Sequence, residues 1–237
     1  MVAIEIEAGK FIKWTNDNCG FLSLIIFVVT VIIGWMSGFF KSIITKPKLS
    51  IRFIDKSCFH TFFYTGNKYY NKQLDETFEL HKTGFAVYCS IANIGNLPTS
   101  IDKIYLGYYK NLPDRKFWRK RIQWLAQWHI FENFKIKYGD QIVMLPPLRS
   151  RNSEYPGGGE NYLAIGGSII GVAYFEQDEA WGNLNPETIN DKGDIKVILK
   201  IRDIRKAEYR FKTTLKRLSI KEAREINGNF GNVSPIV

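Results

Sequence analysis

Three carboxylates, Glu176, Asp178 and Glu179, stand close together shortly before Trp181. Paired carboxylates can act as a general acid and a general base, and a nearby Trp can stack on a sugar or a nucleobase. The same residue types are also common where a strand passes into a turn, which involves no chemistry. A hydrolase that uses Glu176 and Asp178 is therefore one hypothesis for this chain.

No other residues converge on this region or on a second reactive site. The three histidines are far apart and lack neighbours at metal-ligand spacing: His60, His81 and His129. The glycine tract at 157–159 is not followed by a helical pattern, so it resembles a loop more than a phosphate-binding turn. The sequence thus predicts no metal and no cofactor, and it favours a protein that is not an enzyme.

An uncharged segment over residues 18–40 is the first element that stands out. As a helix these 23 residues would be about 35 Å long, enough to cross a hydrocarbon core of about 30 Å. A cleaved signal peptide is the alternative. Asp17 stands where that alternative needs basic residues, and Phe39 and Phe40 offer no small-residue cleavage pattern. We therefore predict a transmembrane helix over 18–40.

Charges on the two sides of this helix predict its orientation. Residues 1–17 form a short extracytoplasmic tail with net charge −1, whereas four cations follow the helix before the first acid: Lys41, Lys46, Lys48 and Arg52. An excess of cations marks the cytoplasmic side. We expect a single-pass inner-membrane protein with its N-terminus outside, a basic linker over 41–48 and a cytoplasmic C-terminal domain. Free cysteines at Cys58 and Cys89 agree with a reducing compartment.

Within the predicted span, Gly34 and Gly38 form a G-x-x-x-G pattern, and Thr30 extends the same small-residue face by one turn. Small residues four apart let two helix backbones approach closely in lipid. Glycine is also simply common in membrane helices, so both interpretations stay open. The first of them predicts a homo-oligomer that associates through these three residues.

From residue 49 the pattern becomes alternating, as in Phe85, Val87, Cys89 and Ile91, which is typical of half-buried strands. We expect strands near 49–54, 57–65, 85–92, 101–109, 134–144 and 168–176, and a hairpin over 195–215. This predicts a mainly β chain with an antiparallel β-sandwich over 49–226. Ser219 and Glu222 fit a capping box for a short C-terminal helix, followed by a flexible tail over 227–237.

The run from Val87 to Tyr109 resembles paired strands of bacterial immunoglobulin-like sandwiches that follow a single membrane helix. There a strand ends in an Asn-x-Gly turn and a Pro-Thr-Ser segment leads into the next. The matching residues here are Asn93, Gly95, Pro98, Thr99 and Ser100. The resemblance implies an architecture only and carries no site residues across.

One segment, residues 113–131, has an apolar pattern at helical spacing with a basic, Trp-rich composition. We predict an amphipathic helix inserted between strands, whose contact residues are Arg115, Lys116, Trp118, Arg119, Lys120, Arg121, Trp124 and Trp128. Such a helix can lie in a membrane interface. It can equally pack its aromatic side on the sandwich. Binding of nucleic acid ranks third, because membrane tethering restricts access to it.

The 237-residue chain has net charge +10, 45% hydrophobic residues and a mean hydropathy of −0.17. This composition excludes a disordered chain and a polytopic membrane protein. Two segments carry the excess charge, 113–131 with net +4 and 195–225 with net +7. The cations of the second segment alternate with apolar residues. They form either a surface for anionic headgroups or a solvated strand face.

Together these patterns favour a non-enzymatic membrane protein whose cytoplasmic β-sandwich binds a partner protein or ligand at the bilayer surface. The first alternative is an oligomerising, membrane-perturbing effector of a bacterial toxin or antiviral defence system. The second is the hydrolase that uses Glu176 and Asp178. The expected partners are the lipid bilayer, further copies of the chain and an unknown protein or small molecule.

Overall fold

A computed structural model describes residues 13–38, 46–111, 122–128, 133–138, 140–148, 161–178 and 184–231, without the side chains of Lys56 and of 136–138. The chain divides into two compact units, Met1–Lys46 and Pro47–Val237, and each is described by itself. The first contains one long apolar helix. The second contains the strands.

Helix α2 (Cys19–Met36) contains no charged residue and no buried one. Its 18 residues have a mean hydropathy of 2.5, so it is long and apolar enough to cross a membrane. Gly38 lies beyond its end with a φ of +74°, a left-handed conformation that commonly terminates helices. The helix is therefore shorter than the predicted 18–40. Of the predicted association face it contains Thr30 and Gly34.

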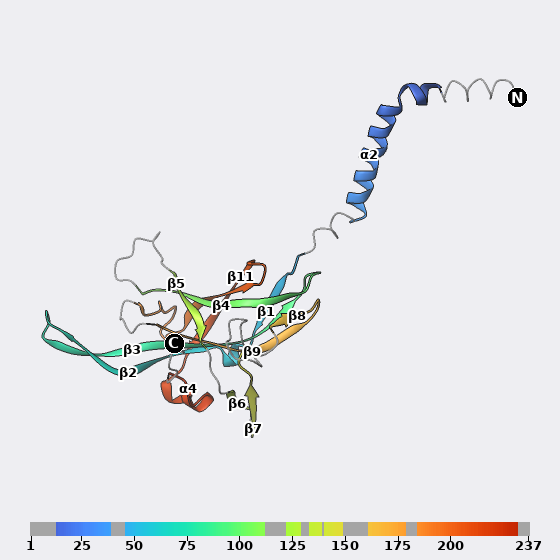
Figure 1. The fold of residues 1–237 in the computed structure, drawn as a ribbon. Coiled ribbons are helices and arrows are strands. Elements are labelled where there is room, and N and C mark those ends of the chain that lie inside the picture. The colour runs from blue at the N-terminus through green and yellow to red at the C-terminus, as the bar shows by residue number, and fades with distance from the viewer. Residues whose placement is uncertain are drawn as a thin grey trace. The chain divides into compact units, whose positions relative to one another are not determined.

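The second unit is mainly β, as expected, and its strands are drawn as arrows in Figure 1. They are β1 (Leu49–Phe53), β2 (Phe59–Asn71), β3 (Glu76–Asn93), β4 (Thr99–Tyr109), β5 (Ile122–Trp128), β6 (Phe134–Tyr138), β7 (Gln141–Leu145), β8 (Tyr162–Leu163), β9 (Ser168–Glu176), β10 (Ile195–Asp203) and β11 (Glu208–Arg217). A short 3-10 turn, η1 (Asp55–Ser57), precedes β2, and helix α4 (Ile220–Ile226) follows β11.

The strand pairings form a closed circuit. They run β3–β2–β11–β10–β4–β5–β9 and return to β3, because β9 pairs with β3 from Gly84↔Glu176 to Ala92↔Ser168. The strands thus do not separate into the two unlinked sheets of a sandwich. The pairing of β11 with β2 is parallel and joins only Lys216 and Arg217 to β2, whereas the other strand pairs are antiparallel.

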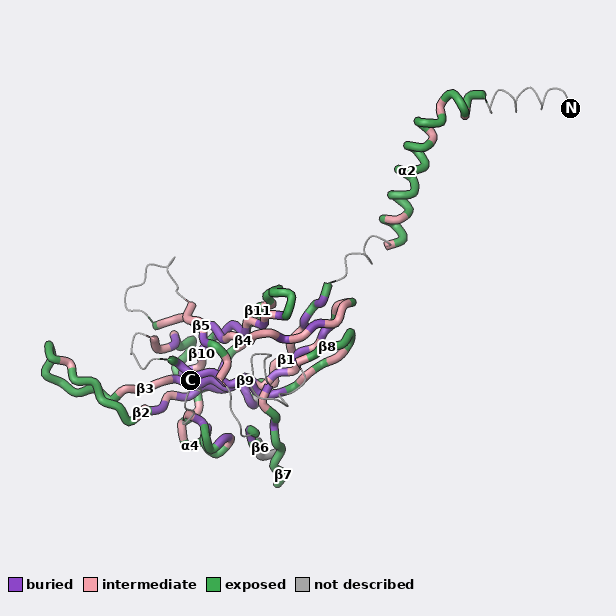
Figure 2. The backbone as a smooth tube through the Cα atoms, viewed as in Figure 1, coloured by how far each residue is buried: buried purple, intermediate pink, exposed green. Residues whose placement is uncertain are grey.

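The main core consists of the inward side chains of this circuit. Phe85, Leu106, Phe175 and Leu199 come from four different strands, belong to one cluster and have no exposed surface. The alternation predicted for residues 85–91 is confirmed, because Phe85, Val87, Cys89 and Ile91 all belong to this cluster. In Figure 2 the buried residues concentrate where the strands pair with one another.

A second apolar cluster covers the outer side of β2, β3 and β9. It joins Phe59, Ala86 and Tyr174 to Phe134 of β6 and Ala223 of α4. The predicted capping box of α4 is confirmed, since Ser219 and Glu222 exchange both hydrogen bonds. The chain stays packed after α4. Phe230 is fully buried against Phe59 and Tyr174, with ring centroids 5.3 and 5.0 Å away, so no flexible tail begins at 227.

Two sequence-based predictions of elements were wrong. Residues 122–128 of the expected amphipathic helix form strand β5, which pairs with β4 and then with β9. The expected strand over 134–144 is a hairpin, β6 and β7. In both places the neighbouring strands satisfy backbone hydrogen bonds that a local pattern of apolar residues does not reveal.

Candidate functional site

Glu176, the main residue of the hydrolase hypothesis, is almost completely buried, with 4% exposure. Its Oε2 accepts a hydrogen bond of 3.0 Å from the Tyr174 hydroxyl, and its Oε1 lies 3.7 Å from Nζ of Lys82. Burial raises the pKa of Glu176, while Tyr174 and Lys82 oppose that rise. Asp178 is exposed, and Glu179 and Trp181 lie outside the described residues. Both oxygens of Glu176 thus have partners within the fold.

The histidines that the structure describes have structural partners. His60 is fully buried, its Nε2 donates to the Gly193 carbonyl oxygen at 2.9 Å, and its ring stacks on Phe85 at 6.3 Å. Burial lowers the pKa of His60 to about 4, so the ring is neutral near pH 7. His81 lies 3.0 Å from the side-chain oxygen of Asn185. Among the described residues no group of His, Cys, Asp and Glu has the geometry of a metal site.

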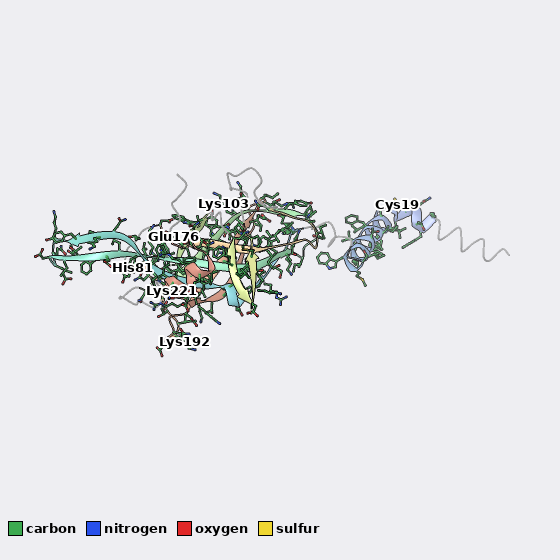
Figure 3. The ribbon with its side chains drawn as sticks, turned by 90° about the horizontal axis from the view of Figure 1, so that it is seen from below. Cys19, His81, Lys103, Glu176, Lys192 and Lys221 are labelled. Carbon is green, nitrogen blue, oxygen red and sulfur yellow. The ribbon has the colours of Figure 1, made fainter. Side chains whose placement is uncertain are left out.

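Gln177 ends the ladder between β3 and β9 and is 1% exposed. Its side chain accepts a hydrogen bond of 2.9 Å from the Thr83 N–H and donates to the Tyr108 hydroxyl at 2.8 Å. It also donates to the Leu184 carbonyl oxygen at 2.7 Å. One buried amide therefore joins three segments at the end of the domain that carries His81 and Glu176, which Figure 3 labels.

Replacing Gln177 with Leu is expected to lower the free energy of unfolding by about 1–3 kcal/mol, because the buried Thr83 N–H loses its acceptor. Urea titration of the full chain in detergent measures the change. Gln73→Leu is the matched control, since Gln73 is exposed and its variant should stay within about 0.5 kcal/mol of wild type. Equal losses in the two variants would contradict this role for Gln177.

Of the eight contact residues predicted for the basic segment, Trp124 and Trp128 lie in the described part of the chain, on β5. The other six lie outside it: Arg115, Lys116, Trp118, Arg119, Lys120 and Arg121. Trp128 packs on the second apolar cluster, and Lys82 lies 5.9 Å from its ring centroid. Trp124 lies on the outer side of β4, β10 and β11 instead. The two Trp residues thus belong to different surfaces.

Trp124 contributes to a surface that we name the cationic–aromatic face. The face is formed by outward side chains of four adjacent strands: Tyr105, Trp124, Lys196, Lys200, Arg202, Glu208, Arg210, Lys212 and Lys216. As predicted, the cations of β10 alternate with the core side chains Ile195, Val197, Leu199 and Ile201, and the cations of β11 lie on the outer face of the next strand. This face brings six cations and one acid to one side of the sheet.

Specific contacts organise the centre of this face. Nζ of Lys200 lies 4.7 Å from the ring centroid of Tyr105 and 4.6 Å from that of Trp124, which is cation–π geometry. The Trp124 ring lies over Gly107, where a Cβ atom would come within 2.8 Å of Cζ3 of that ring. Gly107 is therefore the residue that lets the indole lie close to the sheet, beside the lysine.

Glu208 forms ion pairs with two of these cations. It lies 3.3 Å from Nζ of Lys200 and 3.1 Å from Nη2 of Arg210. The hydrogen bonds from Arg210 and Lys200 lower the pKa of Glu208. Arg202 is paired with Asp102 at 2.7 Å. Lys196, Lys212 and Lys216 are exposed at the rim. The face therefore has an ordered aromatic centre and a rim of cations that can attract an anionic group.

Sequence reasoning missed Tyr105 as a member of this face, Gly107 as the residue beneath Trp124 and Asp102 as the partner of Arg202. A signal existed, because Tyr105 and Gly107 occupy the outward positions of a strand whose inward positions are Ile104, Leu106 and Tyr108. The register that places them beside Lys200 and Trp124 comes from pairing with β10 and β5. Segments so distant in sequence cannot be aligned from alternation alone.

Comparison with known proteins gives no relative that could assign this face. No known protein family and no curated protein sequence matches the chain. A structural comparison finds the crystal structure of Spo0M, a sporulation control protein from Bacillus subtilis, with a TM-score of 0.26 and 8% sequence identity. That match covers 74% of this chain and 55% of the Spo0M chain, so the chain spans about half the length of that protein. A likeness this low carries no argument about fold or function.

Proposed function

We propose that the protein is a single-pass protein of the inner membrane, with its N-terminus outside and its β domain in the cytoplasm. There the domain binds an acidic partner protein or an anionic ligand at the membrane surface through the cationic–aromatic face. The observation that carries the proposal is helix α2, which is long and apolar enough to cross a membrane and has no buried residue.

The energetics of α2 support an anchor. An 18-residue helix is about 27 Å long, close to the thickness of a hydrocarbon core of about 30 Å. Eleven of its residues are Leu, Ile, Val or Phe. On an insertion scale these residues contribute about −3 to −7 kcal/mol in favour of the bilayer. In water the same side chains would remain hydrated on every side of the helix.

The cationic–aromatic face supports the binding part of the proposal. Aromatic rings and arginine are enriched at protein interfaces, where rings supply contact area and guanidinium groups bind carboxylates. Trp124 and Tyr105 are partly exposed, and Arg210 keeps 62% of its side chain exposed. A domain tethered to a membrane meets a surface-bound partner at high effective concentration. Modest affinity at such a face is then sufficient for function.

Membrane fractionation of cells that express the full chain tests the anchor. We expect the wild type to stay in the membrane after alkaline carbonate extraction, with residues 1–40 still present by mass spectrometry. The variant Ile26→Arg/Val29→Arg should be released, because each central Arg opposes insertion by about 2.5–3.5 kcal/mol. Ile26→Leu/Val29→Leu is the matched control and should remain membrane-bound. Loss of residues 1–40 from the mature protein would identify a signal peptide and overturn the proposal.

Two further measurements test the orientation and the face. Protease added to the periplasmic side of spheroplasts should leave the β domain intact, and digestion there would place the domain outside. Labelled polyglutamate serves as the acidic probe for the purified chain. Its binding should weaken in Arg210→Glu/Lys212→Glu and with added salt, but not in Lys192→Glu, whose exposed cation lies on a loop. Equal binding by all three proteins would remove the face from the proposal.

A further inference from the structure

Strands β2 and β3 continue together past the rest of the domain as a two-stranded arm, residues 64–81 (Figure 1). Their pairing runs from Tyr64↔His81 to Asn71↔Glu76, with an irregularity between Tyr64 and Lys68. Five large apolar side chains of the arm are exposed by 42–70%: Tyr64, Tyr69, Tyr70, Leu74 and Phe78. A hairpin without further strands is only marginally stable, and clustered exposed aromatics commonly mark interaction sites.

The arm has an open edge along β3. The last pair between β3 and β9 is Gly84↔Glu176, after which Gln177 N–H donates to the Thr83 carbonyl oxygen at 3.1 Å. The backbone groups of a strand alternate in direction. The N–H and C=O of residues 77, 79 and 81 therefore point the same way as those of Thr83, beyond the end of β9. In the part of the chain that is described, no strand pairs with this edge.

Charge distinguishes the candidate occupants of this edge. Glu76 and Glu79 lie on β3, Asp75 lies in the turn, where it accepts a hydrogen bond from the Tyr70 hydroxyl of β2, and no Lys or Arg occurs between residues 73 and 81. The lysines of the arm tip, Lys68 and Lys72, lie on β2 and in the turn. Anionic headgroups would be repelled by this edge. A second copy paired symmetrically along β3 would place acids beside acids, which is unfavourable.

Side-chain alternation defines the complementary strand further. Phe78 and Leu80 point to the same side of the arm as Tyr69, the cross-strand partner of Phe78. Glu79 points to the other side, opposite Lys68. A strand that adds to this edge therefore lies beside the apolar side chains of Phe78 and Leu80 on one side of the arm and beside the Glu79 carboxylate on the other. A segment in which apolar and basic residues alternate fits both.

We propose that the open edge of β3, from Glu76 to His81, binds an extended basic segment of a partner protein by strand addition. The backbone of residues 77, 79 and 81 supplies the hydrogen bonds, Glu79 pairs with a cation, and Tyr69, Phe78 and Leu80 contact the apolar side chains. This site is separate from the cationic–aromatic face. The β3 edge selects a basic segment, whereas the cationic–aromatic face would bind an acidic group. Binding at the edge therefore does not depend on whether the face binds its own partner.

A labelled peptide in which Lys and Val alternate is the probe, and fluorescence anisotropy with the full chain in detergent is the measurement. We expect binding to the wild type, a loss of a few fold in Glu79→Gln, and a loss of about tenfold or more in Glu79→Pro. Both variants remove the charge, but only Pro removes the outward N–H. Proline is tolerated at such an edge position, because that N–H takes no part in pairing with β2.

Several outcomes would overturn the proposal. Equal binding by Glu79→Gln and Glu79→Pro would show that no strand is added. Binding of a peptide that is methylated at alternate amide nitrogens would also contradict strand addition, because such a peptide cannot donate the backbone hydrogen bonds. This test uses the wild-type chain, so it remains valid even if Glu79→Pro unfolds the arm. Binding of a Glu–Val peptide as tightly as the Lys–Val peptide would contradict the charge assignment. Competition by phosphatidylglycerol vesicles would assign the edge to lipid instead. Self-association that Glu79→Pro abolishes would assign it to a second copy.

Discussion

Replacing Phe85 with Ala is expected to lower the free energy of unfolding of the β domain by about 3–5 kcal/mol. Phe85 has no exposed surface, and its ring stacks on Tyr108 with centroids 5.3 Å apart and on His60 at 6.3 Å. It lies on β3, the strand that pairs with β1, β2 and β9. A cavity at this point therefore removes contacts from several strands, and the surrounding backbone is too well paired to collapse into it.

Urea titration of the full chain, followed by Trp fluorescence, measures this loss. Phe78→Ala is the matched control, because Phe78 lies on the same strand but is 42% exposed on the arm. We expect it to change the free energy of unfolding by less than about 1 kcal/mol. If both variants lost the same stability, Phe85 would not be the centre of the core that the packing indicates.

The elements that could be predicted from the sequence are those whose signal is local. The alternation at Phe85, Val87, Cys89 and Ile91 is continuous, and the Ser219–Glu222 capping box spans four residues. The charge pattern of β10 and β11 is local in the same way. A period of two specifies which side of a strand faces the core, and a cap specifies where a helix begins. Neither depends on distant parts of the chain.

The interpretation of residues 113–131 as a helix was wrong over 122–128, because two periods fit the same residues there. Ile122, Leu125 and His129 match a helical repeat, whereas Ile122, Trp124, Ala126 and Trp128 match a strand. Ile and Trp both favour strands, and β4 offers a pairing partner from Tyr105 to Tyr109. The pairing is a long-range interaction, so it decides the outcome without leaving a local signal.

The candidate sites were less predictable than the strands for the same reason. Glu176 was selected for its neighbours in sequence, Asp178 and Trp181, yet its partners are Tyr174 and Lys82. The centre of the cationic–aromatic face requires Lys200, Trp124 and Tyr105 to meet from three strands. The open edge at β3 depends on where β9 ends. Each of these is a consequence of register, which a single sequence does not specify.

His60 is expected to make the stability of the domain depend on pH between about 6.5 and 4. Its burial lowers the pKa to about 4 in the folded chain, whereas the unfolded chain has the ordinary value of 6.5. In this window the unfolded state binds a proton that the folded state does not. Stability is therefore fully present above pH 6.5 and falls with decreasing pH until the folded pKa is reached. The loss is about 1.4 kcal/mol per pH unit, or about 3 kcal/mol in total.

Urea titrations of the full chain across this pH range, repeated with His60→Gln, test the expectation. Gln keeps a donor for the Gly193 carbonyl oxygen but does not titrate, so its stability should be nearly constant where that of the wild type falls. The raised pKa of Glu176 changes stability with pH in the opposite direction. This contribution is the same in the wild type and in His60→Gln, so it cancels when the stability of one is subtracted from that of the other. A wild-type slope that persists in His60→Gln would show that another group binds the proton on unfolding.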